Sequence, residues 1–282
     1  MINNLATEQE IFKYNNLPQE KLSGLSPSQT HEVIHNMLGE KCCLQFRSNL
    51  TADVLNQIPF FRISEKLLEI IQRDGFIKPT PLGALPKKVL VELYNYKFIT
   101  DELIESGISK LHHEDYCIAI KTARIVCQLT NFVKKSNGKL LLTKNGERCL
   151  KAENRVELFK MIFLTFTEKF NWAFNDGYPS EPTGQFGYLF TIYLLKKFGK
   201  KEESTDFYAL RYLRAFEKFI TFFNEDYTTP ENQFKTCFNV RTFERFTEWF
   251  GLTTIVGEKR SLIAENIKIV KTDLLDKIFV YA

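Results

Sequence analysis

The chain has 282 residues, with 38 Lys and Arg against 34 Asp and Glu. This length is enough for roughly two domains of ordinary size. A formal net charge of +4 excludes the strong basic excess of a dedicated nucleic-acid coat protein, so any nucleic-acid site must be local.

Cysteine usage and the apolar runs indicate the compartment. The six cysteines form no Cys-x-x-Cys pair, which favours free thiols in a reducing cytoplasm. Residues 1–21 show no basic start followed by an apolar run, so we expect no secretory signal. The longest apolar stretch, residues 186–198, is shorter than the roughly 20 residues that cross a bilayer. We therefore expect a cytoplasmic protein with no membrane partner.

The first predicted helix begins at Ser26. The serine hydroxyl can cap the helix, Pro27 suits its first turn, and Gln29 completes a capping box. This pattern predicts an ordinary surface helix over the residues that follow.

That helix carries the pentapeptide HEVIH at residues 31–35. His31 and His35 should lie one turn apart on one face, where both could hold Zn²⁺. Glu32 would then activate the metal-bound water as the base of a zinc-dependent peptidase. The motif alone therefore describes a complete catalytic mechanism.

A third zinc ligand is the weak point of this hypothesis. The best candidates are Glu65 and Glu69 on a later predicted helix, whose apolar stripe consists of Leu67, Ile70 and Ile71. We expect both glutamates to lie on the opposite face and to point to water. The peptidase is therefore the less favoured alternative, and we expect no cofactor and no catalytic residue.

The next elements follow the order of a winged helix. Asn137-Gly138 is a strong hairpin signal, because both residues tolerate positive φ. The predicted elements are a helix over 64–74, a strand over 76–78, helices over 86–96 and 114–132, and a hairpin over 132–143.

The second half of the sequence repeats part of this order. After a predicted helix over 153–175, the loop NDGYPSEPTG leads to helices near 186–199 and 204–224. Then come a helix, two extended runs and a short final helix. Thr143 and Thr272 each end a predicted hairpin and can cap the next helix with the hydroxyl.

The expected fold class is therefore mainly α with small β-hairpins. We expect two winged-helix-like modules joined by a Phe-rich helical layer. The predicted domains are an N-terminal helical lead over 1–60, a winged-helix-like module over 61–152, and the helical layer with the second module over 153–282.

Two stretches carry a family resemblance. The segments PTPLGALPKKVLVELY and GKLLLTKNG resemble LT-x-x-G motifs in the C-terminal regions of plasmid open-reading-frame-three-like proteins, an uncharacterised bacterial family. The resemblance covers about residues 60 to 150, and Pro81 and Leu82 stand where polar residues are usual. It implies a winged-helix-like fold and no particular activity.

A winged helix binds DNA with one helix in the major groove and with phosphate contacts from the wing. Both predicted wings and both predicted recognition helices carry cations. The candidate nucleic-acid-binding residues are Lys121, Arg124, Lys134, Lys135 and Lys139 in the first module, and Arg241, Arg245, Lys259 and Arg260 in the second.

Acidic neighbours weaken this nucleic-acid hypothesis. Glu114 and Asp115 open the first recognition helix, where they would repel phosphate, and glutamates alternate with the arginines of the second. The patterns therefore favour a non-enzymatic interaction or scaffold protein, with nucleic-acid binding as a regulator left open. A DNA-binding transcriptional regulator and the HExxH peptidase are the alternatives. The partner, protein or nucleic acid, and the oligomeric state stay open.

Overall fold

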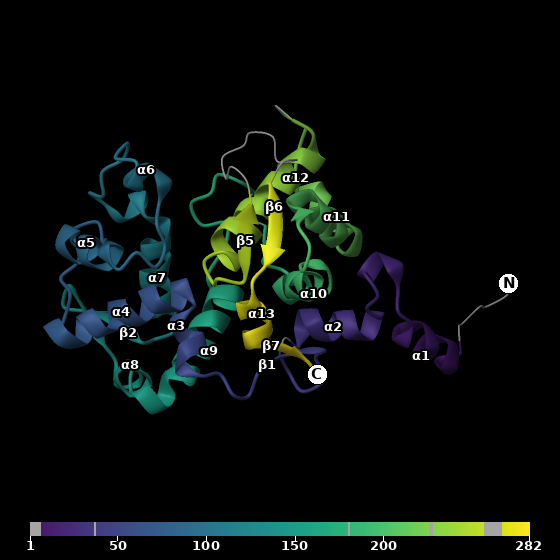
Figure 1. Cartoon of the computed structure of the whole chain (residues 1–282), viewed down its shortest axis with the longest axis horizontal. Coiled ribbons are helices and arrows are strands. Elements are labelled where there is room, and N and C mark those ends of the chain that lie inside the picture. Colours follow the sequence, from purple (N-terminus) through teal and green to yellow (C-terminus); the bar gives the residue numbers. More distant parts are fainter. Residues whose placement is uncertain (1–6, 37, 180, 226–227, 257–266) are drawn as a thin grey trace. The chain divides into compact units, whose positions relative to one another are not determined.

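The computed structural model describes residues 7–36, 38–179, 181–225, 228–256 and 267–282. The contacts between residues divide the chain into two compact units (Figure 1). Unit 1 comprises residues 1–48, 172–248 and 252–282, and unit 2 comprises 49–171 with 249–251. The Phe-rich segment is thus shared between the units. The domain boundaries predicted at residues 60 and 152 stay a prediction.

Unit 2 is mainly helical with one hairpin. Its helices are α3 (Ala52–Asn56), α4 (Pro59–Asp74), α5 (Lys87–Asn95), α6 (Glu102–Glu105), α7 (Ile118–Leu129), α8 (Lys144–Cys149) and α9 (Arg155–Leu164), with the 3₁₀ turns η2 (Glu114–Tyr116) and η3 (Ala152–Asn154) and the π-helical turn η4 (Thr165–Lys169). The strands β2 (Val133–Ser136) and β3 (Lys139–Leu142) form the hairpin.

Helix α4 starts earlier than predicted. It begins at Pro59 rather than at Ser64, because proline at the first helical position fits the helix and needs no hydrogen-bond acceptor. The Ser64 hydroxyl instead donates to the carbonyl of Phe60 within the helix, at 2.9 Å. The apolar stripe of α4 packs against α7, and this contact forms the centre of the unit.

The hairpin of unit 2 turns at the predicted Asn-Gly pair. Asn137 and Gly138 have φ of +49° and +69°, which matches the right-handed twist of the flanking strands. The predicted strand over 76–78 is reduced to a single bridge, in which Ile77 and Leu140 exchange backbone hydrogen bonds of 3.0 and 2.8 Å. This bridge places β3 between β2 and the segment that follows α4.

Aromatic rings fill the core of unit 2, and two of them come from far along the chain. The rings of Phe60 and Trp249 stack with centroids 5.7 Å apart, and the ring of Phe250 meets those of Phe163 and Phe166 at 5.2 and 5.1 Å. The backbone N–H of Phe60 also donates to the carbonyl of Trp249 at 2.8 Å.

Unit 1 contains the helices α1 (Glu8–Asn16), α2 (Pro27–His35), α10 (Tyr188–Phe198), α11 (Thr205–Ala215), α12 (Pro230–Phe238) and α13 (Asp273–Ile278), the 3₁₀ turns η1 (Glu20–Leu22) and η5 (Glu217–Phe222), and the π-helix η6 (Asn239–Thr247). Its strands are β1 (Leu44–Phe46), β4 (Glu203–Ser204), β5 (Thr253–Val256), β6 (Lys268–Lys271) and β7 (Phe279–Tyr281).

Two small antiparallel sheets organise unit 1. In one, β6 lies between β4 and β5, with Ile269 opposite both Glu203 and Ile255. In the other, β1 pairs with β7, which follows α13 directly, and Phe46 lies opposite Phe279. The sequence did not predict this pairing of distant segments.

Several predicted helix bounds hold and others change. The start of α2 is confirmed, since Ser26 and Gln29 form both hydrogen bonds of the capping box. The segments predicted as single helices over 114–132, 153–175 and 204–224 instead divide into η2 with α7, α9 with η4, and α11 with η5.

Within the described part of the chain, no helix has the length and the apolar run needed to cross a bilayer.

The Thr143 cap yields a first prediction. Its hydroxyl accepts from the N–H of Gly146 at 3.1 Å and donates to the carbonyl of Asn131 at 2.7 Å, which joins the end of the hairpin to the end of α7. Thr143→Ala should lower the free energy of unfolding by about 1 kcal/mol in denaturant titration. Thr143→Ser keeps the capping hydroxyl and should therefore keep most of this stabilisation. Equal losses in both variants would contradict the capping role.

Candidate functional site

In unit 2, the arginine of the predicted recognition helix is bound inside the protein. Arg124 on α7 forms a two-pronged ion pair with Glu114, with N–O distances of 2.8 and 2.9 Å. The Glu114 carboxylate also accepts the backbone N–H of Leu85 at 2.7 Å, and it is fully buried. The expectation that Glu114 would face DNA and repel phosphate is therefore wrong, because Arg124 neutralises it.

The lysine of the same helix is also paired. Lys121 forms an ion pair with Asp115, which additionally lies 2.8 Å from His113. The hydrogen bond from Lys121 holds the pKa of Asp115 below its usual value, so the carboxylate is charged at neutral pH. Both cations of α7 thus have a carboxylate partner before any ligand arrives.

The wing of unit 2 differs from α7. Lys134 and Lys135 on β2 are exposed, and neither forms an ion pair with another described residue. Lys139 on β3 places its Nζ 3.7 Å from the centroid of the Phe76 ring, which is a cation–π contact and leaves the charge uncompensated. The hairpin therefore presents positive charge that no described carboxylate neutralises.

In unit 1, Arg241 lies in the interior. The sequence predicts Arg241 on the polar face of its helix, but only 1% of the residue is exposed, so this prediction is wrong. Its guanidinium binds the buried carboxylate of Asp176 at 2.6 Å, and it donates to the carbonyls of Pro179 and Glu181 at 2.7 Å each. A second contact with Asp176 at 3.2 Å brings the number of polar contacts that compensate the buried charge to four.

Arg245, one helical turn after Arg241, binds the backbone of the same loop between η4 and α10. It donates to the carbonyls of Phe174 and Asn175 at 3.2 Å each, and burial lowers its pKa from the ordinary value. Together, Arg241 and Arg245 hold the backbone of the loop between η4 and α10 against the π-helix η6. The two remaining candidates, Lys259 and Arg260, lie outside the described residues.

The HEVIH segment forms the second and third turns of α2. Thr30 and Val33 are the buried residues of this helix, while His31 and His35 are exposed with ring centroids 4.6 Å apart. The Glu32 carboxylate accepts a hydrogen bond of 3.0 Å from Asn36.

The two glutamates considered as a third zinc ligand have other partners in unit 2. Glu65 is buried rather than exposed, and it binds Arg155 through N–O distances of 2.5 and 2.9 Å, so the prediction that it points to water is wrong. Glu69 forms an ion pair with Lys66. Among the described residues, no three His, Cys, Asp or Glu side chains are grouped so that they could hold one metal ion.

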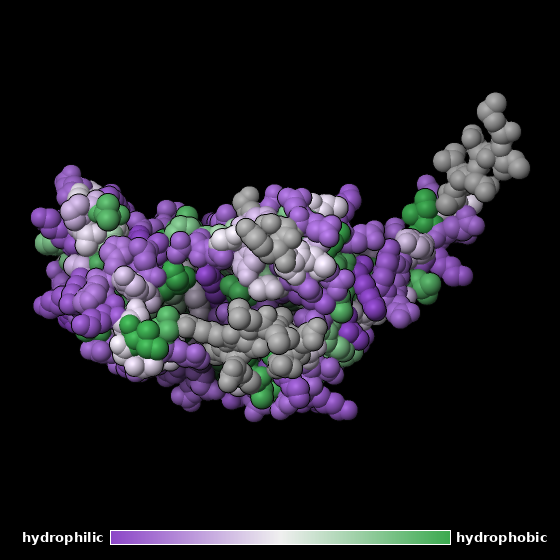
Figure 2. All heavy atoms as spheres, turned by 90° about the horizontal axis from the view of Figure 1, so that it is seen from above, coloured by the Kyte–Doolittle hydropathy of each residue, from purple (hydrophilic) through white to green (hydrophobic). Residues whose placement is uncertain are grey.

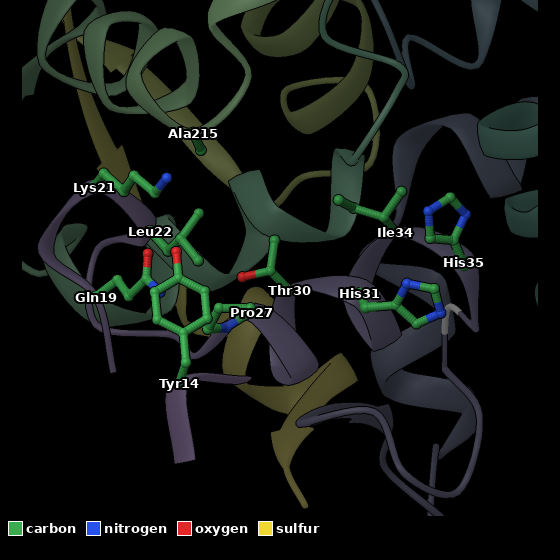
Figure 3. Close-up of a pocket in the computed structure, with 10 residues that line it drawn as sticks. All are labelled: Tyr14, Gln19, Lys21, Leu22, Pro27, Thr30, His31, Ile34, His35 and Ala215. Carbon is green, nitrogen blue, oxygen red and sulfur yellow. The ribbon is translucent and has the colours of Figure 1, made fainter. Parts of the chain in front are cut away.

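The two histidines lie at the rim of a pocket in unit 1 (Figure 3). Its volume is about 310 Å³. The close-up shows both rings at one end of the pocket and Tyr14 at the other, with Thr30 between them. The lining thus joins the histidine face of α2 to a side chain of α1.

Helix α1 is the surface that the sequence interpretation missed. Thr7 and Glu10 form both hydrogen bonds of a capping box, yet the helix buries none of its residues. Ile11, Phe12 and Tyr14 are 50%, 72% and 57% exposed. Hydrophobic side chains are visible on the segment beside the N-terminal end of the chain (Figure 2). The available signal was the T-x-x-E pattern at residues 7–10, which marks a helix start.

Comparisons of the chain with protein-family models, with curated protein sequences and with solved structures found no match.

The buried Arg241–Asp176 pair yields a second prediction. Arg241→Met should lower the free energy of unfolding by about 3–5 kcal/mol, because it leaves the Asp176 carboxylate buried without its cation. Denaturant titration measures the loss. The double variant Arg241→Met/Asp176→Asn should lose less than the sum of the two single variants. Additive losses would show that the two side chains do not stabilise unit 1 as a pair.

Proposed function

We propose that this chain is a non-enzymatic interaction protein with two winged-helix-like modules, which binds a partner protein through the apolar side chains of α1. The exposed, fully capped α1 is the observation that carries the proposal. The resemblance to plasmid open-reading-frame-three-like proteins stays a prediction that agrees with the fold part of this proposal.

The order of elements supports the two modules. In unit 2, α4, the Ile77 bridge, helices α5 and α7 with the one-turn α6 between them, and a hairpin follow one another, and β3 is the central strand. In unit 1, the same order runs through α10, β4, α11, α12 with η6, and the strands β5 and β6, with β6 central. A winged helix has this order of helices and strands.

The internal pairing of cations favours a protein partner over base reading. A recognition helix needs free donors to contact base edges in the major groove. Arg124 and Lys121 are paired with carboxylates, and Arg241 is buried. Contact with bases would require these ion pairs to open, and an unpaired buried carboxylate is costly.

Helix α1 supports the choice of the binding surface. A helix that contributes no buried residue gains little from the core of its own unit, and large exposed apolar side chains that gather on one element mark interaction surfaces. Ile11 and Tyr14 are three positions apart, so their side chains lie on the same face of the helix. An apolar groove on a partner protein would cover them.

A third prediction tests this surface. Phe12 is replaced by the photo-crosslinking amino acid p-benzoylphenylalanine, and the same probe is placed at the similarly exposed Tyr116 in unit 2. We expect a discrete cross-linked protein from position 12 in the native cells, and its loss when Ile11→Asp is added. Folding should be unaffected, since α1 buries no residue. Identical products from both positions, or products that survive Ile11→Asp, would remove α1 as the docking surface.

The wing of unit 2 favours a second candidate function, which is contact with the phosphate backbone of nucleic acid. The observation is the uncompensated charge of Lys134 and Lys135 on one exposed strand. Such contacts position a protein on a duplex without reading its sequence. This candidate would be a regulator that binds nucleic acid weakly and without strong base preference.

A fourth prediction concerns this wing. Binding of duplex DNA, followed by fluorescence anisotropy between about 50 and 200 mM salt, should weaken as salt rises. Lys134→Ala/Lys135→Ala should make the slope of log K against log[salt] less negative by about 1.8, because two phosphate contacts are lost. Lys121→Ala, which removes a lysine already paired with Asp115, is the matched control. A flat salt response in the unmodified protein would eliminate the nucleic-acid candidate.

A further inference from the structure

We propose that His31 and His35 form a two-histidine chelate for a divalent late transition-metal ion on the surface of α2. This site goes beyond the interaction function and does not depend on it. It also replaces the expectation of no cofactor, which was based on the three ligands that a zinc peptidase requires.

The ring geometry fits a chelate. A metal–nitrogen bond of about 2.1 Å places each ring centroid roughly 3.2 Å from the ion, so two ligands at about 90° have centroids about 4.5 Å apart. The observed separation of the two rings is 4.6 Å. The separation of the two rings is therefore the one that a shared ion requires at this angle.

The position of the rings on α2 supports binding. His31 and His35 are both exposed, so an ion can reach them without opening the protein. Helix α2 is fixed at its start by the Ser26–Gln29 capping box and on its inner face by Val33, which is fully buried. Because the helix backbone holds the two histidines one turn apart, the backbone need not rearrange when the ion binds.

The same geometry separates this site from a peptidase centre. Two protein ligands leave the remaining coordination positions for water or for donors from another molecule. Glu32 accepts its hydrogen bond from Asn36, and the described residues offer no third side chain that completes the set. A catalytic zinc site normally holds its ion with three protein ligands, so we assign binding and not hydrolysis to this pair.

The ligand set indicates which ions bind best. Imidazole nitrogens suit Zn²⁺, Cu²⁺ and Ni²⁺, and affinity for a given nitrogen site rises from Mn²⁺ to Cu²⁺. An angle near 90° between two ligands is the angle of square-planar and octahedral coordination, which Cu²⁺ and Ni²⁺ adopt. Ni²⁺ is the better probe, because it does not oxidise the neighbouring thiols of Cys42 and Cys43.

A fifth prediction follows. Isothermal titration of the full chain, made without a polyhistidine tag, should show one equivalent of bound Ni²⁺. His31→Ala and His35→Ala should each weaken binding roughly tenfold or more, because a single imidazole loses the chelate. His112 and His113 are adjacent in the chain rather than one helical turn apart, and His113 already lies 2.8 Å from Asp115. His112→Ala/His113→Ala is therefore the matched control and should bind as the unmodified chain does.

Two further measurements make the outcome decisive. Cys42→Ser/Cys43→Ser should retain binding, which separates the histidines from the nearby thiols. In the unmodified chain, paramagnetic Ni²⁺ should broaden the NMR signals of the His31 and His35 rings first, which locates the ion without any substitution. The proposal is overturned if no equivalent binds, if the cysteine variant abolishes binding, or if the signals of His112 and His113 broaden first.

Discussion

A single short backbone pairing in each unit closes a hairpin against a segment that lies more than sixty residues earlier in the chain. A two-stranded hairpin is at best marginally stable in water, and it needs a third strand or a packed helix. Ile77 supplies that third partner to Leu140 in unit 2, and Glu203 supplies it to Ile269 in unit 1. Leu140 and Ile269 are almost fully buried. The pairing therefore fixes where the hairpin lies relative to the helices before it, and it makes the central strand part of the core.

The charges inside the two units are the second constraint, and they bear directly on function. Glu114 with Arg124 and Asp176 with Arg241 are ion pairs in which at least the carboxylate is buried. One member of each pair also binds the backbone of a loop: Glu114 accepts the N–H of Leu85, and Arg241 donates to the carbonyls of Pro179 and Glu181. A side chain that holds its own fold in this way is not available to a DNA base. Arg124 and Arg241, which in the sequence suggest nucleic-acid binding, therefore stabilise the fold through ion pairs within the protein.

The surfaces that remain free lie elsewhere. In unit 1 they are the apolar side chains of α1 and the histidine pair of α2, which border one pocket. In unit 2 they include the exposed lysines Lys134 and Lys135 of the wing. The histidine pair and α1 are close enough to share that pocket through Tyr14, so a partner that covers α1 could supply donors to a bound ion (Figure 3). An interaction role for α1 and metal binding by α2 are thus compatible, and each stands on its own measurement.

By itself, the sequence determined the features that depend on neighbouring residues. The Ser26–Gln29 capping box, the turn at Asn137-Gly138, the cap at Thr143 and the mainly helical class were all predicted, because each arises from groups within a few positions of one another. Only the tertiary structure decided which charged side chains are buried and which partners they bind. Glu65 was expected in water and Arg241 on a polar face, but their partners lie 90 and 65 residues away. Helical periodicity places a side chain on a face, whereas its burial depends on which distant segment covers that face.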